Sequence, residues 1–193
     1  MRNTVLVLTN SADGTHSDIV IRKLEKLGVT VFRCDVDLLA KGELAIKFEV
    51  GQNTFGFEML RGDKKLLSTD IKSIWYRRPN SLNSPIVDLI QRKYAEMETN
   101  QFLEGLWSAT ISEVFWLSNP VHLERARKKV LQLKIARQLG FTIPRTIVSN
   151  DPKQVSQFFE SCDERMIFKA IHHEMFDYEN KSFNIPTTLI GRE

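Results

Sequence analysis

Cysteines are scarce in this chain, and their placement argues against a disulfide framework or a Cys/His metal site. The only two, Cys34 and Cys162, lie far apart, and neither belongs to a CxxC motif or to a Cys/His pair with metal-type spacing. We therefore expect two reduced, unpaired thiols.

Long apolar runs are also missing. No stretch approaches the roughly 18 to 20 apolar residues that a membrane-spanning helix needs. The apolar run near the N-terminus, residues 5–8, is far too short for the core of a signal peptide. We expect a cytoplasmic protein without a membrane partner.

The chain has no large excess of one charge sign. Its 27 basic residues nearly balance 24 acidic ones, for a net charge of +3, and so small an imbalance does not indicate a nucleic-acid partner. Hydrophobic residues make up 42% and charged residues 26%, which is typical of a folded globular protein. The length of 193 residues fits one domain plus part of another.

The first part of the chain predicts a sheet with parallel strands. Residues 4–9 are a short β-branched run, a helix capped by Ser17 and ended by Gly28 follows, and residues 29–34 form the next strand. Strand, helix and strand within about thirty residues make a βαβ unit, whose two strands are parallel.

More elements extend this domain. Residues 44–50 and 54–60 alternate in polarity around a Gly-Gln-Asn turn and predict a hairpin. Residues 71–76 and 114–117 predict two further strands. Between them, apolar residues recur at helical spacing from Pro85 to about Ala109.

The last part of the chain alternates helices and strands and predicts a second lobe of α+β type. Its elements are a helix opened by Asn119 and Pro120 and ended by Gly140, a strand at 142–148, a helix capped by Asn150 and started near Pro152, and a strand at 166–171. We place the domain boundary between Ser118 and Asn119, so that a mixed α/β domain, residues 1–118, precedes the lobe, residues 119–193.

Two lysines of the lobe, Lys129 and Lys169, are candidates for binding phosphate. A lysine ammonium neutralises phosphate oxygens as a compact point charge, and on a rigid strand it loses little freedom on binding. Lys169 lies in the run Phe168–Ile171, which we expect to be half-buried; the alternative is an edge-strand lysine that blunts sheet pairing. Lys128 and Lys129 point about 100° apart on a helix, and Lys129 lies nearer the apolar side.

Arg77 and Arg78 form a basic pair directly after the strand at 71–76, where Pro79 turns the chain out. Two interpretations stay open for the pair. Its guanidinium groups face phosphates or an acidic peptide, or they are solvated on a loop.

Four segments, in this order, resemble the ATP-grasp superfamily and within it the graspetide synthetases, ligases that mature ribosomally made peptides of the microviridin and marinostatin type. The segments are residues 5–37, the SIWYRRP run at 73–79, the Asn-Pro at 119–120 with the stretch 126–152, and the MIFKAI strand at 166–171. The resemblance implies an α/β fold: a pre-ATP-grasp domain with a mixed, partly parallel sheet, followed by an incomplete α+β ATP-grasp lobe.

The resemblance implies that ATP activates an Asp or Glu side-chain carboxylate of a precursor peptide as an acyl phosphate. A Ser or Thr hydroxyl or a Lys amine of the same peptide then attacks it and forms an ester or amide cross-link. Lys129 and Lys169 match the nucleotide-contacting lysines of the family. Arg77 and Arg78 match an arginine pair facing the substrate or the phosphates, with a structural anchor at the domain junction as the alternative.

Besides ATP, the resemblance implies Mg²⁺ as a cofactor. The acidic metal ligands of the family fall in later segments without a counterpart before Glu193, so we expect no metal ligands within this chain and a ligase that is incomplete and poorly active alone. His172 and His173, with acidic residues after them, suggest a metal site, but adjacent residues of a strand point to opposite sides, which favours a solvated loop.

The partner that the resemblance implies is a ribosomal precursor peptide, whose basic leader residues would meet Glu174, Asp177 and Glu179. Relatives commonly form homodimers. Two other functions stay open: a module that binds a leader peptide or partner protein without catalysis, and an ATP-grasp ligase that acts on a small metabolite.

Overall fold

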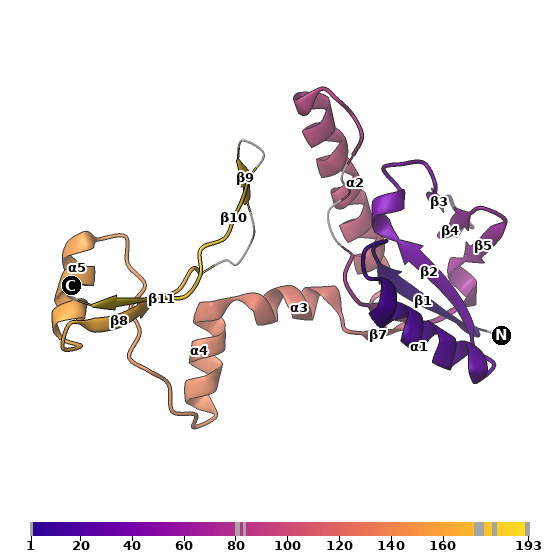
Figure 1. Ribbon diagram of the computed structural model, residues 1–193. Coiled ribbons are helices and arrows are strands. Elements are labelled where there is room, and N and C mark those ends of the chain that lie inside the picture. The colour runs from indigo at the N-terminus through magenta and orange to yellow at the C-terminus, as the bar shows by residue number, and fades with distance from the viewer. Residues whose placement is uncertain (1, 80–81, 83, 172–175, 179–180, 192–193) are drawn as a thin grey trace. The chain divides into compact units, whose positions relative to one another are not determined.

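The structure is a computed structural model that describes residues 2–79, 82, 84–171, 176–178 and 181–191. They form two compact units, which divide between Leu123 and Glu124 (Figure 1). Among the described residues, no helix combines the length and apolarity that crossing a bilayer requires.

A four-stranded parallel sheet forms the centre of the first unit. Its strands, in spatial order, are β2 (Thr30–Asp35), β1 (Thr4–Thr9), β6 (Ile71–Tyr76) and β7 (Phe115–Leu117). Helix α1 (Gly14–Lys26) connects β1 to β2 and lies along them (Figure 1). The βαβ unit and its parallel pairing are therefore as the sequence predicts.

Helix α1 begins earlier than predicted. Asp13 is its N-cap residue, and Ser17 is buried in the first turn, where its hydroxyl donates to the backbone carbonyls of Asp13 at 3.0 Å and Gly14 at 3.3 Å. The prediction of Ser17 as the cap was wrong, because the hydroxyl is used inside the helix. Gly28 ends the helix as predicted, with a φ of 76° that costs glycine little.

Three antiparallel strands make a separate small sheet. They are β3 (Ala45–Val50), β4 (Phe55–Arg61) and β5 (Lys64–Leu67), in the order β3-β4-β5. The predicted hairpin is β3 and β4, whereas β5 was not predicted. The missed signal is Gly62 and Asp63, a two-residue turn in which Gly62 has a φ of 55°.

The core of the first unit joins the parallel sheet, the small sheet and α2 (Leu89–Thr110). One cluster of buried side chains draws on all three: Leu6 and Leu8 of β1, Phe57 and Met59 of β4, Leu66 of β5, and Leu103, Leu106 and Trp107 of α2. Trp107 packs edge-to-face against Trp116 of β7, with ring centroids 6.2 Å apart. Two 3-10 turns, η1 (Val36–Leu38) and η2 (Ser68–Asp70), complete the unit.

The predicted start of α2 at Pro85 was wrong. The helix begins at Leu89 because the Asp88 side chain caps it, accepting a hydrogen bond of 2.8 Å from the backbone N–H of Gln91.

The sequence after Asn119 forms two helices where one was predicted, α3 (Pro120–Arg127) and α4 (Lys129–Gln138). Asn119 caps α3 as predicted, since its side chain accepts from the N–H of Val121 at 2.9 Å. Lys128 between the helices is extended, with φ −70° and ψ 104°. No glycine or proline lies at this break, so it has no local signal in the sequence.

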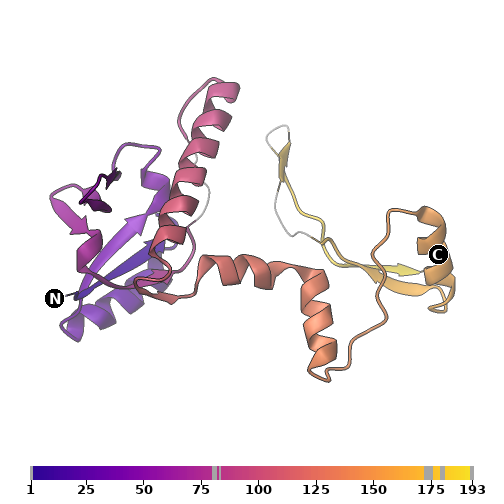
Figure 2. The same cartoon turned by 180° about the vertical axis from the view of Figure 1, so that it is seen from behind.

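The second unit continues with short elements (Figure 2). They are α5 (Pro152–Glu160), β8 (Arg165–Phe168) paired antiparallel with β11 (Thr188–Gly191), and β9 (Phe176–Tyr178) paired antiparallel with β10 (Lys181–Phe183). Helix α5 is capped by Asp151, whose carboxylate accepts from the N–H of Lys153 at 2.9 Å, and not by the predicted Asn150.

The strand predicted at 142–148 does not form. Pro144 removes one N–H donor from this segment. Arg145 fastens the segment to the end of α5 instead, since its guanidinium donates to the backbone carbonyl of Ser161 at 2.9 Å and to its hydroxyl at 3.0 Å.

Met59 and Leu60, on opposite faces of β4, test the assigned core. Met59 is fully buried and Leu60 is 41% exposed, so Met59→Ala should lower the free energy of unfolding by about 2 to 5 kcal/mol and Leu60→Ala by less than about 1 kcal/mol. Urea unfolding followed by tryptophan fluorescence measures this for the first unit, which holds every tryptophan of the chain. Equal losses would contradict the assignment.

Candidate functional site

The loop that follows β1 is fixed on one side by a buried carboxylate. Asp37, just after β2, accepts hydrogen bonds from the backbone N–H of Ser11 at 2.8 Å and from its hydroxyl at 2.5 Å. Burial would raise the pKa of Asp37, but the Ser11 hydrogen bonds, one from the backbone of Asp37 and the charge of Lys41 outweigh it, and the pKa lies below its ordinary 3.8.

The same loop is fixed on the other side by the end of β6. The Asp13 carboxylate, 3% exposed, accepts from the Thr9 hydroxyl at 2.9 Å and lies 3.4 Å from Nε of Arg77. Asn10 donates from its side-chain amide to the backbone carbonyl of Arg78 at 2.6 Å. In the first unit Arg77 therefore acts as an anchor between β6 and the loop.

Arg78 lines a hollow at this edge of the sheet. The other lining residues are Asn10, Ala12, Asp13, Gly14, Thr15 and His16, and the volume is about 370 Å³. The guanidinium of Arg78 makes no hydrogen bond or ion pair with the residues that the structure describes, and its side chain is exposed. The structure thus gives the two arginines different environments.

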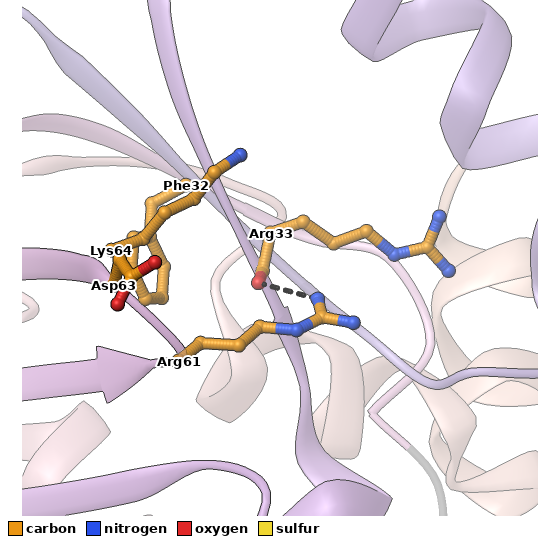
Figure 3. Close-up of a pocket in the computed structure, with 5 residues that line it drawn as sticks. All are labelled: Phe32, Arg33, Arg61, Asp63 and Lys64. Carbon is orange, nitrogen blue, oxygen red and sulfur yellow. Dashed lines mark hydrogen bonds between the residues drawn. The ribbon is translucent and has the colours of Figure 1, made fainter.

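A second hollow, of about 310 Å³, is lined by Phe32, Arg33, Arg61, Asp63 and Lys64 (Figure 3). Both arginines that line it are already paired with carboxylates of the protein. The Asp35 carboxylate, 2% exposed, accepts from Nε of Arg33 and is paired with Nη1 of Arg61, both at 2.8 Å. Arg33 also pairs with Asp18 at 2.5 Å, and Arg61 donates to the Arg33 carbonyl at 3.1 Å. The arginines of this hollow therefore belong to an ion-pair network that holds the fold together.

In the second unit, Lys129 comes next to Lys169. The Lys129 ammonium donates to the backbone carbonyl of Ala170, the residue directly after Lys169. Lys128 turns elsewhere and pairs with Glu124 one helical turn back. The extended conformation at Lys128 accompanies this difference, because it places Lys129 at the first turn of α4.

Lys169 itself differs from its prediction in two ways. It follows β8, which ends at Phe168, and it is exposed. Phe168 and Ile171 are 46% and 55% exposed, so the expected half-buried surroundings are absent within the described residues of this unit. Pairing ends here because Phe168 lies opposite Thr188, and Pro186, shortly before Thr188, has no N–H to donate.

The sequence profile of the MvdD pre-ATP grasp domain matches residues 4–124. This range is more than half of the chain and includes β1 to β7, α1 and α2. The chain belongs to this family. No match was found among curated proteins.

Solved structures of two macrocyclases share the fold of this chain. The macrocyclase MdnC of Microcystis aeruginosa MRC, solved with the precursor peptide MdnA, is 28% identical with a TM-score of 0.87 over 96% of this chain. The macrocyclase MdnB of the same organism is 27% identical with a TM-score of 0.81 over 99%. The chain spans 61% of the MdnC and 62% of the MdnB chain.

A ligase of Chryseobacterium gregarium shares the fold at lower identity. This RiPP-associated ATP-grasp ligase was solved with ADP and with a leader and core peptide. It is 24% identical with a TM-score of 0.85, and the match covers 98% of this chain and 56% of the ligase chain. The predicted family is confirmed by the match to the pre-ATP-grasp domain, and the two macrocyclase structures share its fold.

Of the other predicted site residues, only Asp177 lies among those that the structure describes. Glu174 and Glu179 lie outside the described residues, as do His172 and His173. Asp177 lies on β9. In the part of the chain that the structure describes, no group of three His, Cys, Asp or Glu side chains is placed to hold a metal ion.

Cys34 of the pre-ATP-grasp domain is not a nucleophile near neutral pH. Both cysteines are free thiols, as predicted. Burial, with Asp35 adding to it, raises the pKa of the Cys34 thiol to about 12, so the reactive thiolate is scarce.

The lowered pKa of Asp37 predicts a pH dependence for Ser11→Ala. The Asp37 contacts stabilise the fold above the ordinary carboxyl pKa, and this contribution is lost as pH falls through the folded pKa. Ser11→Ala should therefore lower the free energy of unfolding by about 1 to 3 kcal/mol near neutral pH and by progressively less below about pH 4.

Urea unfolding across this pH range measures the effect, and Thr99→Ala is the control. The Thr99 hydroxyl donates to the neutral backbone carbonyl of Ala95 at 2.8 Å, so its loss should be constant with pH. A pH-independent loss for Ser11→Ala as well would contradict the role of Asp37.

Proposed function

We propose that this chain serves an ATP-dependent ligase that activates Asp or Glu side chains of a ribosomal precursor peptide. The γ-phosphoryl group of ATP passes to a carboxylate oxygen, which gives an acyl phosphate and ADP. A Ser or Thr hydroxyl or a Lys amine of the same peptide then attacks the acyl carbon, loses its proton and displaces phosphate. The product is an ester or amide cross-link.

The observation that carries the proposal is the proximity of Lys129 to Lys169. The carbonyl of Ala170 accepts from the Lys129 ammonium and holds it beside the backbone of Lys169. Lys169 is exposed and has no partner among the described residues. A polyphosphate bound at this place could contact the Lys129 ammonium and the exposed Lys169 side chain together, and each contact would be charge-assisted. Phosphoryl transfer depends mostly on such positioning and charge stabilisation.

The relatives support a peptide as the second substrate. MdnC was solved with its precursor peptide, and a ligase of the same fold was solved with ADP and peptide segments. Magnesium accompanies ATP in most phosphoryl transfers. The described residues offer it no group of acidic ligands, so the proposal assigns it no residue of this chain.

Nucleotide binding tests the roles of the two lysines. Lys129→Ala and Lys169→Ala should each weaken ADP binding by about tenfold or more, because each removes a charged hydrogen bond to phosphate worth about 1.5 to 3 kcal/mol. Isothermal titration of the chain with ADP measures the dissociation constants.

Lys128→Ala is the matched control for this titration. It removes the same charge one position away, where the ammonium pairs with Glu124, and it should change ADP binding by less than about twofold. If all three variants bind ADP as tightly as the wild type, the lysine assignment is wrong.

Trapping with hydroxylamine tests the chemistry. An acyl phosphate reacts with hydroxylamine to a hydroxamate, so incubation with ATP, magnesium and a precursor peptide should add the corresponding mass to an Asp or Glu of the peptide. Peptide binding without ADP binding would instead favour a recognition module. A hydroxamate formed on a free amino acid but not on the peptide would favour a metabolite ligase.

A further inference from the structure

The hollow beside Arg78 lies where open parallel sheets bind ligands. From β1 the chain passes through α1 to β2 on one side of β1, while β6 lies on the other side. The carboxyl ends of β1 and β6 are therefore the point at which the strand order reverses. Ligands of open α/β sheets bind in the crevice outside the strand ends at such a point. Asn10 and Arg78, just after these two ends, both line the hollow.

The backbone at Arg78 is fixed, whereas its charge is left available. The N–H of Arg78 donates to the Leu8 carbonyl at 3.4 Å, and its own carbonyl accepts from Asn10 at 2.6 Å. Pro79 follows directly and restricts the backbone further. A side chain on such a support loses less freedom on binding than one on a loose loop.

Arg77 prevents the acidic residue of the hollow from repelling an anion. Asp13 also lines the hollow, but its carboxylate already accepts from Thr9 and faces the Arg77 guanidinium. Arg77 and Asp13 together carry no net charge, so the charge of Arg78 makes the hollow positive. His16, which also lines the hollow, offers a further donor without adding negative charge.

We propose that this hollow is an oxyanion subsite in which the Arg78 guanidinium binds a carboxylate or phosphate group, while Arg77 is a positioning residue. The planar guanidinium offers paired donors that match either group bidentately. The subsite deepens the proposed function, on which its use for a peptide carboxylate rests. Binding of a simple anion at Arg78 does not rest on that function.

NMR titration of the labelled chain tests the subsite at constant ionic strength. The probes are N-acetyl-glutamate N-methylamide, its neutral glutamine analogue and inorganic phosphate. We expect the glutamate probe to shift the backbone amide signals of Thr15 and His16 and the side-chain Nε–H signal of Arg78, whereas the glutamine analogue should leave them in place. If phosphate alone shifts them, the anion comes from the nucleotide and the subsite stands.

Three variants identify the binding group. Arg78→Gln should weaken the probe at least tenfold, and Arg78→Lys should weaken it less, because a point charge remains without the paired donors. Arg22→Gln removes the same charge from an exposed position of α1 outside the hollow and should change nothing. The dispersion of the amide spectrum shows whether each variant is folded.

Two results would overturn the proposal: no shift with either anion, or equal binding by folded Arg78→Gln and wild type. Both are independent of ADP binding at Lys129 and Lys169, so failure of the subsite and failure of the proposed function are distinguishable.

Discussion

The first unit depends on two buried carboxylates that hold the loop after β1 from opposite sides. On the side of β2, the Asp37 carboxylate accepts hydrogen bonds from Ser11. On the side of β6, the Asp13 carboxylate accepts a hydrogen bond from Thr9 and faces the Arg77 guanidinium. A buried carboxylate is costly unless its oxygens are paired, so these contacts restrict the loop to one arrangement. The strand ends and the first turn of α1 thereby keep fixed positions around the hollow.

Local patterns in the sequence were sufficient for most of the first unit. The βαβ unit, the hairpin of β3 and β4, and strand β6 follow from hydrophobic periodicity and turn residues, which act over a few neighbouring positions. The two arginines after β6 were also visible as a pair. Their different environments could not be seen in the sequence. Asp13 faces Arg77, and the parallel pairing of β1 with β6 brings the two residues together.

Features that depend on tertiary contacts were missed in the second unit. The break at Lys128 lies among good helix formers, and the contact of Lys129 with Ala170 joins residues that are far apart in the sequence. Lys169 was predicted to lie in the strand because Phe168 and Ile171 flank it, yet β8 ends at Phe168, opposite Thr188, where its antiparallel partner β11 begins. Sequence could thus nominate the lysines but could not describe their surroundings.

The arginine network of the second hollow has a consequence for the free side of the sheet. β2 is an edge strand, and Arg61 donates to the backbone carbonyl of Arg33 on that strand. A carbonyl occupied in this way is withdrawn from pairing with the strand of a foreign chain, and the guanidinium brings charge to the same place. Edge strands protected by charged side chains resist intermolecular sheet extension, so this hydrogen bond and the charge of Arg61 should hinder aggregation through this edge.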